Sequence, residues 1–132
     1  MTVEIPTELF GAWRLVSYED RESEDEAWGQ PLGDGAHGLL VCHPPATVSV
    51  QIYAPEPPGA DGPLYVGYFG RAAARDVARE GTSTRGELLL SLDGGHPAGA
   101  LDGGEPRPFE ITGDMLILGD QRTWRRTRER AT

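Results

Sequence analysis

The chain has 132 residues, which is enough for one domain (residues 1–132) with a sizeable core. Its 18 glycines and 11 prolines argue against a helical bundle and favour many short strands joined by turns. The net charge of −9 argues against nucleic acid as a partner, and no apolar run is long enough to span a membrane. The single cysteine, Cys42, excludes an internal disulfide; because the N-terminus also lacks signal-peptide features, we expect a cytoplasmic protein.

The chain opens with a predicted helical turn and a predicted strand. Pro6, followed by the apolar Leu9 and Phe10, predicts one short N-terminal turn that covers an end of the fold. Residues 11–20 then alternate with the period of two that is typical of a half-buried strand. One face of this strand carries Trp13, Leu15 and Ser17, and the other carries Arg14, Val16 and Tyr18.

An acidic run follows, with six acids among the eight residues from Glu19 to Glu26. Such a run repels itself and stays solvated, so we predict a mobile loop that continues to about Gly38. These carboxylates could in principle hold a metal, but they lack the glycine and the ligand spacing of a calcium loop. We therefore prefer the solvated loop.

Further strands are predicted along the rest of the chain. The expected ranges are 38–43, 47–53, 64 to about 76, 82–92, 107–111, 115–118 and a last strand that begins near Gln121. A proline-rich loop at 54–63, a glycine-rich loop at 93–105 and tight turns at 112–114 and 119–120 connect them. About eight antiparallel strands with short links predict an all-β, up-and-down barrel of the size that closes around one small ligand.

All twelve basic residues are arginines, and five of them lie between Arg122 and Arg130. We predict that these five are solvated outer positions of the last strand and a frayed tail, in preference to a phosphate site.

Five segments carry a family resemblance in their order along the chain: residues 11–18, 38–41, 68–71, 107–118 and 124–126. Together they resemble the bacterial and fungal lipocalin-like domain family, within the calycin barrels. The resemblance implies that Trp13 plugs the closed end of the barrel, with an arginine of the last strand across its ring. It also implies a ligand carrier or a cofactor-free cyclase or isomerase, of the kind often encoded beside natural-product pathways. Two departures, a short proline-rich segment before Tyr68 and alanines at Ala72–Ala74, argue against transferring a particular ligand.

Familiar catalytic signatures are absent from the sequence, including a glycine-rich phosphate loop, His-Glu-x-x-His and Gly-x-Ser-x-Gly. The three histidines, His37, His43 and His96, lie in or beside predicted loops without a metal-ligand spacing. Cys42 and His43 are adjacent on a strand and so point to opposite faces, which excludes a direct dyad. We expect Cys42 to be a small core or outer-wall residue.

The predicted barrel lining is therefore the candidate site. On the fourth strand, Val66, Tyr68, Gly70, Ala72 and Ala74 share a small, mostly apolar face that we predict to point inward. Its glycine and alanines would leave a cavity beside Tyr68; the alternative is that large side chains such as Trp13 and Phe109 fill that space.

Two positions remain open at this level. Arg107 shares a face with Phe109 and Ile111, which places its charge either inside the barrel with a partner or at the rim. On the third strand we expect Val48, Val50 and Ile52 to point inward; the reversed register would instead give a polar inner wall.

The leading functional hypothesis is a cofactor-independent cyclase or isomerase that holds a largely apolar, oxygenated substrate in a reactive shape. Tyr68 and Arg107 are the candidate catalytic residues, polarising a carbonyl or stabilising an enolate. The predicted ligand-binding residues are Trp13, Val50, Val66, Gly70, Ala72, Phe109 and Trp124. We expect a small hydrophobic or polyketide-like molecule as the partner and no metal or cofactor, and a homodimer is compatible with the sequence. The alternatives are a carrier or sensor that uses the same pocket, and a structural protein with a filled barrel.

Overall fold

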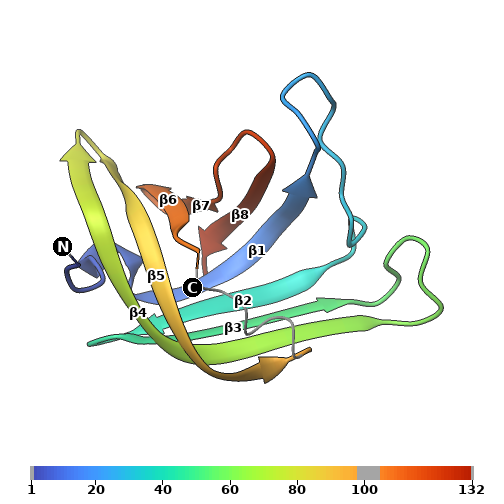
Figure 1. Cartoon of the computed structure of the whole chain (residues 1–132), viewed down its shortest axis with the longest axis horizontal. Coiled ribbons are helices and arrows are strands. Elements are labelled where there is room, and N and C mark those ends of the chain that lie inside the picture. The colour runs from blue at the N-terminus through green and yellow to red at the C-terminus, as the bar shows by residue number, and fades with distance from the viewer. Residues whose placement is uncertain (1, 98–104, 132) are drawn as a thin grey trace.

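The computed structural model describes residues 2–97 and 105–131, and it shows an all-β protein (Figure 1). Eight antiparallel strands follow one another around a closed barrel, and the last strand pairs with the first. The predicted up-and-down barrel is thus confirmed. Its elements are η1 Thr7–Leu9, β1 Gly11–Asp20, β2 His37–His43, β3 Thr47–Ala54, β4 Leu64–Glu80, β5 Ser83–His96, β6 Arg107–Thr112, β7 Met115–Leu118 and β8 Trp124–Arg130. None of the helices in the described residues has the length and apolarity to cross a membrane.

The β4 and β5 strands are longer than the sequence predicted (Figure 1). The prediction that residues 93–96 begin a loop is wrong, because Gly94 and Gly95 pair with Phe69 and Tyr68 of β4. The Phe69 ring lies over Gly94, at the place where a Cβ would stand. The pairing with β4 and the Phe69 ring that covers Gly94 therefore keep this glycine segment in the sheet, although glycine has little intrinsic preference for strands. The remainder of the predicted glycine-rich loop, residues 98–104, lies outside the described residues.

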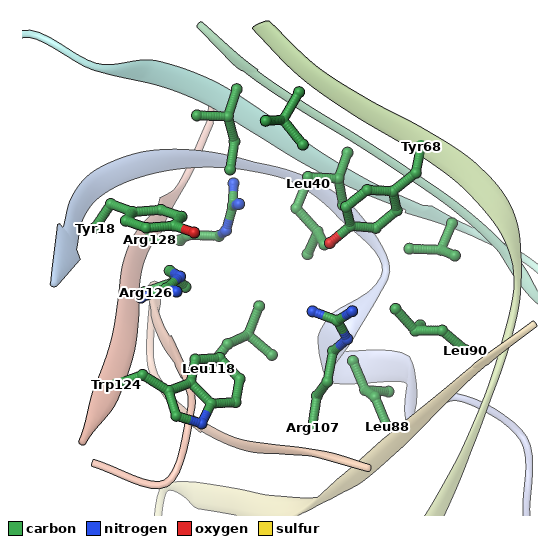
Figure 2. A pocket seen from close by; sticks show the side chains of 14 residues that line it. Tyr18, Leu40, Tyr68, Leu88, Leu90, Arg107, Leu118, Trp124, Arg126 and Arg128 are labelled. Carbon is green, nitrogen blue, oxygen red and sulfur yellow. The ribbon is translucent and has the colours of Figure 1, made fainter. Parts of the chain in front are cut away.

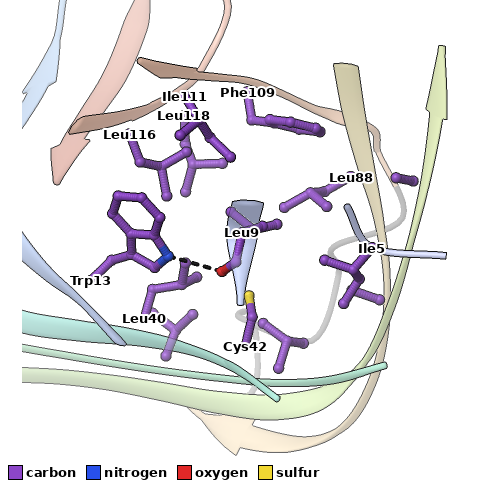
Figure 3. Close-up of a cluster of buried hydrophobic side chains, with 14 of the residues drawn as sticks. Ile5, Leu9, Trp13, Leu40, Cys42, Leu88, Phe109, Ile111, Leu116 and Leu118 are labelled. Atoms are coloured by element: carbon purple, nitrogen blue, oxygen red, sulfur yellow. Dashed lines mark hydrogen bonds between the residues drawn. The ribbon is translucent and has the colours of Figure 1, made fainter. Parts of the chain in front are cut away.

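The closed end of the barrel is built around Trp13, which is fully buried (Figure 3). Its indole Nε1 donates a 2.9 Å hydrogen bond to the carbonyl oxygen of Leu9 in the predicted N-terminal turn. The guanidinium of Arg130 lies 4.1 Å from the Trp13 ring centroid and donates to the carbonyl oxygens of Glu8 and Phe10. Both expectations for this end, the covering turn and an arginine of the last strand across the Trp13 ring, are confirmed.

The inward faces follow the alternation predicted for β3 and β4. Val48, Val50 and Ile52 are buried, which decides the register of β3. Ala72 and Ala74 are also buried in the core cluster. These small residues do not leave empty space, however, and that part of the prediction is wrong. The backbone of β5 at Ser91 and Leu92 approaches Gly70 at a β-bulge so closely that no side chain would fit there.

The inner and outer faces of β1 change places part-way along the strand. Its pairing with β8 shifts register between Leu15 and Ser17, so Val16 is an extra residue at a bulge. Trp13 and Leu15 are buried before the bulge, and after it Tyr18 lines the interior. The alternation of residues 11–20 put Tyr18 on the face opposite Trp13 and Leu15, but the bulge brings it to the same side of the strand as they are.

The arginines of β8 do not form a solvated edge and a frayed tail, as the sequence analysis expected. The strand runs to Arg130 and is paired on both sides, with β7 and with β1. Arg128 has 2% of its surface exposed, the lowest value among the charged residues of the described chain. Closure of the barrel places a strand between two neighbours, so half of its side chains must point inside, whatever their charge.

The acidic run begins within β1, whose range of residues 11–20 was predicted. Glu19 and Asp20 belong to β1 and form ion pairs with Arg125 and Arg126 at 2.9 and 2.8 Å. Beyond them, Trp28 lies between two guanidinium groups, those of Arg21 and Arg125, at 4.0 and 4.2 Å from its ring. Residues from Glu22 to Glu26 are exposed, as expected for a solvated run.

Candidate functional site: an arginine-lined cavity in the barrel

A cavity of about 250 Å³ lies inside the barrel, and most of its wall is apolar (Figure 2). Because β2 to β5 turn alternate β-branched and leucine side chains inward, one wall is a continuous aliphatic surface. Arginines and aromatic residues of β1, β4, β6 and β8 complete the lining. The full set is Tyr18, Leu40, Val48, Val50, Ile52, Val66, Tyr68, Leu88, Leu90, Arg107, Leu118, Trp124, Arg126 and Arg128.

The three arginines face this cavity, and none of the described residues in its lining carries a carboxylate. Arg126 has its own counter-ion outside the lining, because its Nη1 donates to Asp20 Oδ1 at 2.8 Å and to the carbonyl oxygen of Glu19 at 2.9 Å. Its guanidinium also stacks 3.4 Å from the Tyr18 ring centroid. The charge of Arg126 is therefore well balanced by the protein.

Arg128 is in a different situation. Its Nη1 makes one long hydrogen bond, 3.4 Å to the carbonyl oxygen of Trp13, and its Nε is buried without a hydrogen-bond partner in the described chain. Burial lowers the pKa of Arg128 to about 10, against smaller opposing effects from Tyr68, Cys42 and Tyr18. A guanidinium inside an apolar barrel with so few partners is energetically unfavourable.

Arg107 lies at the mouth of the cavity. Its guanidinium carbon is 5.7 Å from the ring centroid of Tyr68, and Figure 2 shows the two side chains pointing toward each other. The Nε of Arg107 is buried and has no hydrogen-bond partner among residues 2–97 and 105–131. Together with Trp124 and Arg126, Arg107 also lines an adjoining surface hollow that Glu105 and Asp120 border. Arg107 thus lies at the rim with its guanidinium directed into the interior. The sequence had left these two positions, inside the barrel and at the rim, as alternatives.

Five of the residues predicted for the site meet at this cavity: Tyr68, Arg107, Val50, Val66 and Trp124. The other four do not line it. Trp13 and Phe109 fill the closed end, Ala72 belongs to the packed core, and Gly70 lies against the β5 backbone. The structure thus brings the two candidate catalytic side chains, Tyr68 and Arg107, to one cavity, whereas the part of the predicted pocket beside Gly70 and Ala72 is filled.

Sequence reasoning missed Tyr18, Arg126 and Arg128. For the two arginines a signal was present, because residues 124, 126 and 128 share one face of a strand and Trp124 was already predicted to face the ligand. For Tyr18 no local signal existed, since the bulge at Val16 is visible only in the pairing with β8.

Other reactive groups of the described chain are not at this site. Cys42 is buried in the core and its pKa is raised to about 12, chiefly by burial, so it is an inert thiol. Among the described residues, no three His, Cys, Asp or Glu side chains are grouped so as to hold a metal ion.

Comparison of the chain with protein-family models, with curated proteins and with solved structures found no match. The geometry of the cavity is therefore the basis for any functional conclusion.

Proposed function

We propose that this protein is a lipocalin-like binding barrel that holds one small, largely apolar molecule in its interior. The observation that carries the proposal is the cavity itself, about 250 Å³ of space with an aliphatic wall where a filled barrel would have core side chains. A cavity of about 150 Å³ holds a molecule the size of benzene. The natural ligand is accordingly a molecule of one or two rings, or a short chain.

A second candidate function is cofactor-independent isomerisation or cyclisation of the bound molecule. The position of Tyr68 and Arg107 favours it, because both side chains reach the same part of the cavity from opposite walls. A phenol and a guanidinium so placed can polarise a carbonyl or stabilise an enolate, while the walls hold the substrate in a reactive shape. Such a substrate is a largely apolar, oxygenated molecule, because these two groups act on a carbonyl or an enolate.

The binding function is tested by mass spectrometry of gently purified protein for a retained small molecule. Val66→Trp, which puts a large ring into the cavity, should abolish retention. Tyr65→Trp is the matched control, because the neighbouring Tyr65 is exposed on the outer face of β4. Equal retention by the two folded variants would place the ligand elsewhere, and an empty wild-type cavity that takes up no small molecule would favour a structural role.

The catalytic candidate is tested on the molecule recovered from the protein and on its chemical precursors, followed by NMR. An enzyme should convert one of them with turnover, and Tyr68→Phe and Arg107→Gln should slow conversion more than they weaken binding. If the bound molecule and its precursors come back unchanged, the protein is a carrier or sensor.

A further inference from the structure

The polar side chains that the described part of the chain turns into the cavity are cations or hydrogen-bond donors, which suit an anion. Of the three guanidinium groups, only that of Arg126 has a carboxylate partner within the described chain, namely Asp20. Arg128 and Arg107 each keep a buried Nε without a hydrogen-bond partner among residues 2–97 and 105–131. The whole chain carries a net charge of −9, so the lining that the described residues form, with three cations and no acid, is a local reversal of the protein's charge.

We propose that the ligand is a small carboxylate whose charged group lies between Arg128 and Arg107, beside the hydroxyl of Tyr68. This inference rests on the proposed binding function and adds the chemical class of the ligand. Tyr68 is the link between the two cations, because its ring faces the Arg107 guanidinium and its hydroxyl points into the cavity between the walls (Figure 2). A carboxylate there accepts charge-assisted hydrogen bonds from both arginines and from the phenol.

The burial of Arg128 is the strongest observation for this assignment. A charged side chain with 2% exposure normally has a full set of partners, yet within the described chain Arg128 has one long hydrogen bond, to a backbone carbonyl oxygen. Its lowered pKa has the same cause, since burial disfavours the cation. A bound carboxylate would neutralise this charge, so part of the ligand's affinity comes from relieving an unfavourable state of the empty barrel.

Arg126 is not the anchor. Its guanidinium is already held by Asp20, by the Glu19 carbonyl oxygen and by the Tyr18 ring, all at the end of β1. The apolar remainder of the ligand then lies against the aliphatic wall formed by residues such as Val50, Ile52 and Leu90. A molecule with one acidic end and one or two apolar rings, or a short alkyl chain, meets both requirements.

The test is isothermal titration calorimetry with two matched pairs of probes, 2-naphthoate with 2-naphthamide and octanoate with octanamide. Each pair has one shape and differs in charge. At least one carboxylate should bind about tenfold or more tightly than its amide, because hydrogen bonds to charged groups are the stronger ones. This preference for the carboxylate should disappear in Arg128→Met and become smaller in Arg107→Gln. If Arg128→Met does not fold, Arg107→Gln still tests the proposal. Arg14→Gln, an exposed outer residue of β1, makes the same change in net charge and should keep the preference.

Three outcomes count against the inference, and they are distinguishable. If the amides bind as well as the carboxylates, the cavity binds ligands but the anion assignment is wrong. If Arg128→Met and Arg107→Gln prefer carboxylates over amides as strongly as the wild type does, the carboxylate binds at another place in the protein. If no probe binds the wild type, or if Val66→Trp binds every probe as tightly as the wild type does, the proposed function of the cavity fails and the inference fails with it.

Discussion

Arg128 shows how a single residue can favour ligand binding while lowering the stability of the ligand-free barrel. Inside the barrel its guanidinium has lost most of its hydration and has gained one 3.4 Å hydrogen bond in return. The neighbouring inward arginine, Arg130, is buried to a lesser degree but stacks on Trp13 and donates to two carbonyl oxygens. Two arginines on one face of one strand therefore have opposite expected effects on stability.

Arg128→Met should leave the free energy of unfolding unchanged or raise it by about 1–4 kcal/mol, as is found when buried ionic groups are replaced by apolar ones of similar volume. Arg130→Met should lower it by about 1–3 kcal/mol, because the stacking and the bonds to Glu8 and Phe10 are lost. Urea unfolding of both variants checks this pair of predictions. A strongly destabilised Arg128→Met would show that the residue has a structural role.

Ala72 gives a second prediction at the residue scale. The sequence suggested that bulk at this position would enter empty space, but Ala72 is 6% exposed and belongs to the packed core. Ala72→Leu should therefore destabilise the protein by about 1–3 kcal/mol while leaving the cavity open. Ala73→Leu, whose side chain is on the outer face, should have a much smaller effect. Thermal melting together with probe binding measures both quantities, and a stable Ala72→Leu variant that no longer binds would restore the original interpretation.

At the scale of elements, the end of β1 and the start of β8 are joined by side chains as well as by the backbone ladder. Glu19 accepts two hydrogen bonds from Arg125, at 2.9 and 3.2 Å, and Arg125 in turn stacks on Trp28 of the following loop. The exposed carboxylates after Arg21 contribute few side-chain contacts to this connection. One of them, Glu24, pairs with Arg122, but both side chains are more than half exposed. The acidic run thus has a structural beginning and a solvated remainder.

Changing Glu22, Glu24, Asp25 and Glu26 together to serine should leave the melting temperature nearly unchanged, since exposed pairs contribute little. The single change Glu19→Gln should destabilise the protein more than the four changes together. It should lower the free energy of unfolding by about 1 kcal/mol, because the charge-assisted hydrogen bonds to Arg125 are weakened. Calorimetry of the two variants decides the ranking. The reverse order would mean that the loop carboxylates hold the barrel, or a cation, together.

For the whole molecule, stability should depend on pH through a few carboxylates tied to the barrel. Hydrogen bonds from Arg79 and Thr84 hold the pKa of Glu8 well below its ordinary value of 4.5, and the bond from Arg125 lowers that of Glu19. Burial would raise the pKa of Asp120, but the backbone N–H groups of Thr123, Arg122 and Trp124 outweigh it and lower this pKa as well. Each group binds its proton more weakly folded than unfolded, so its contribution is present above the unfolded pKa and is lost as the pH falls.

The melting temperature should accordingly be steady near neutral pH and fall as the pH decreases from about 5 to about 3. Glu8→Gln should reduce the size of this fall, because Glu8 ties the closing turn to β4 and β5 through Arg79 and Thr84. Glu22→Gln, an exposed carboxylate of the first loop, is the control and should show the wild-type pH profile. A pH profile that is the same in Glu8→Gln as in wild type would show that this contact is not part of the folded state in solution.

Much of the barrel follows from local patterns. The period of two in residues 47–53 and 64–74, the turns at Gly81 and Gly113 and the Gly11–Trp13 start are short-range features, and each element formed where its pattern indicated. Trp13 at the closed end and the inward faces of β3 and β4 were predictable for the same reason. Tyr68 and Arg107 were also named as candidate catalytic residues because each lies on a mostly apolar strand face, although the sequence left Arg107 either inside the barrel or at its rim.

The sequence by itself therefore determined the class of fold, the number of strands and most of the inward faces, since these depend on alternation within each strand. Tertiary structure alone decided which part of the interior is empty and which side chains line that part. The bulge at Val16 reverses β1 only in its pairing with β8, and the β5 backbone fills the space beside Gly70. Arg126 and Arg128 share the strand face of Trp124, but only the closed barrel places them beside empty space. Such outcomes depend on register between strands that are distant in the chain, which no local pattern encodes.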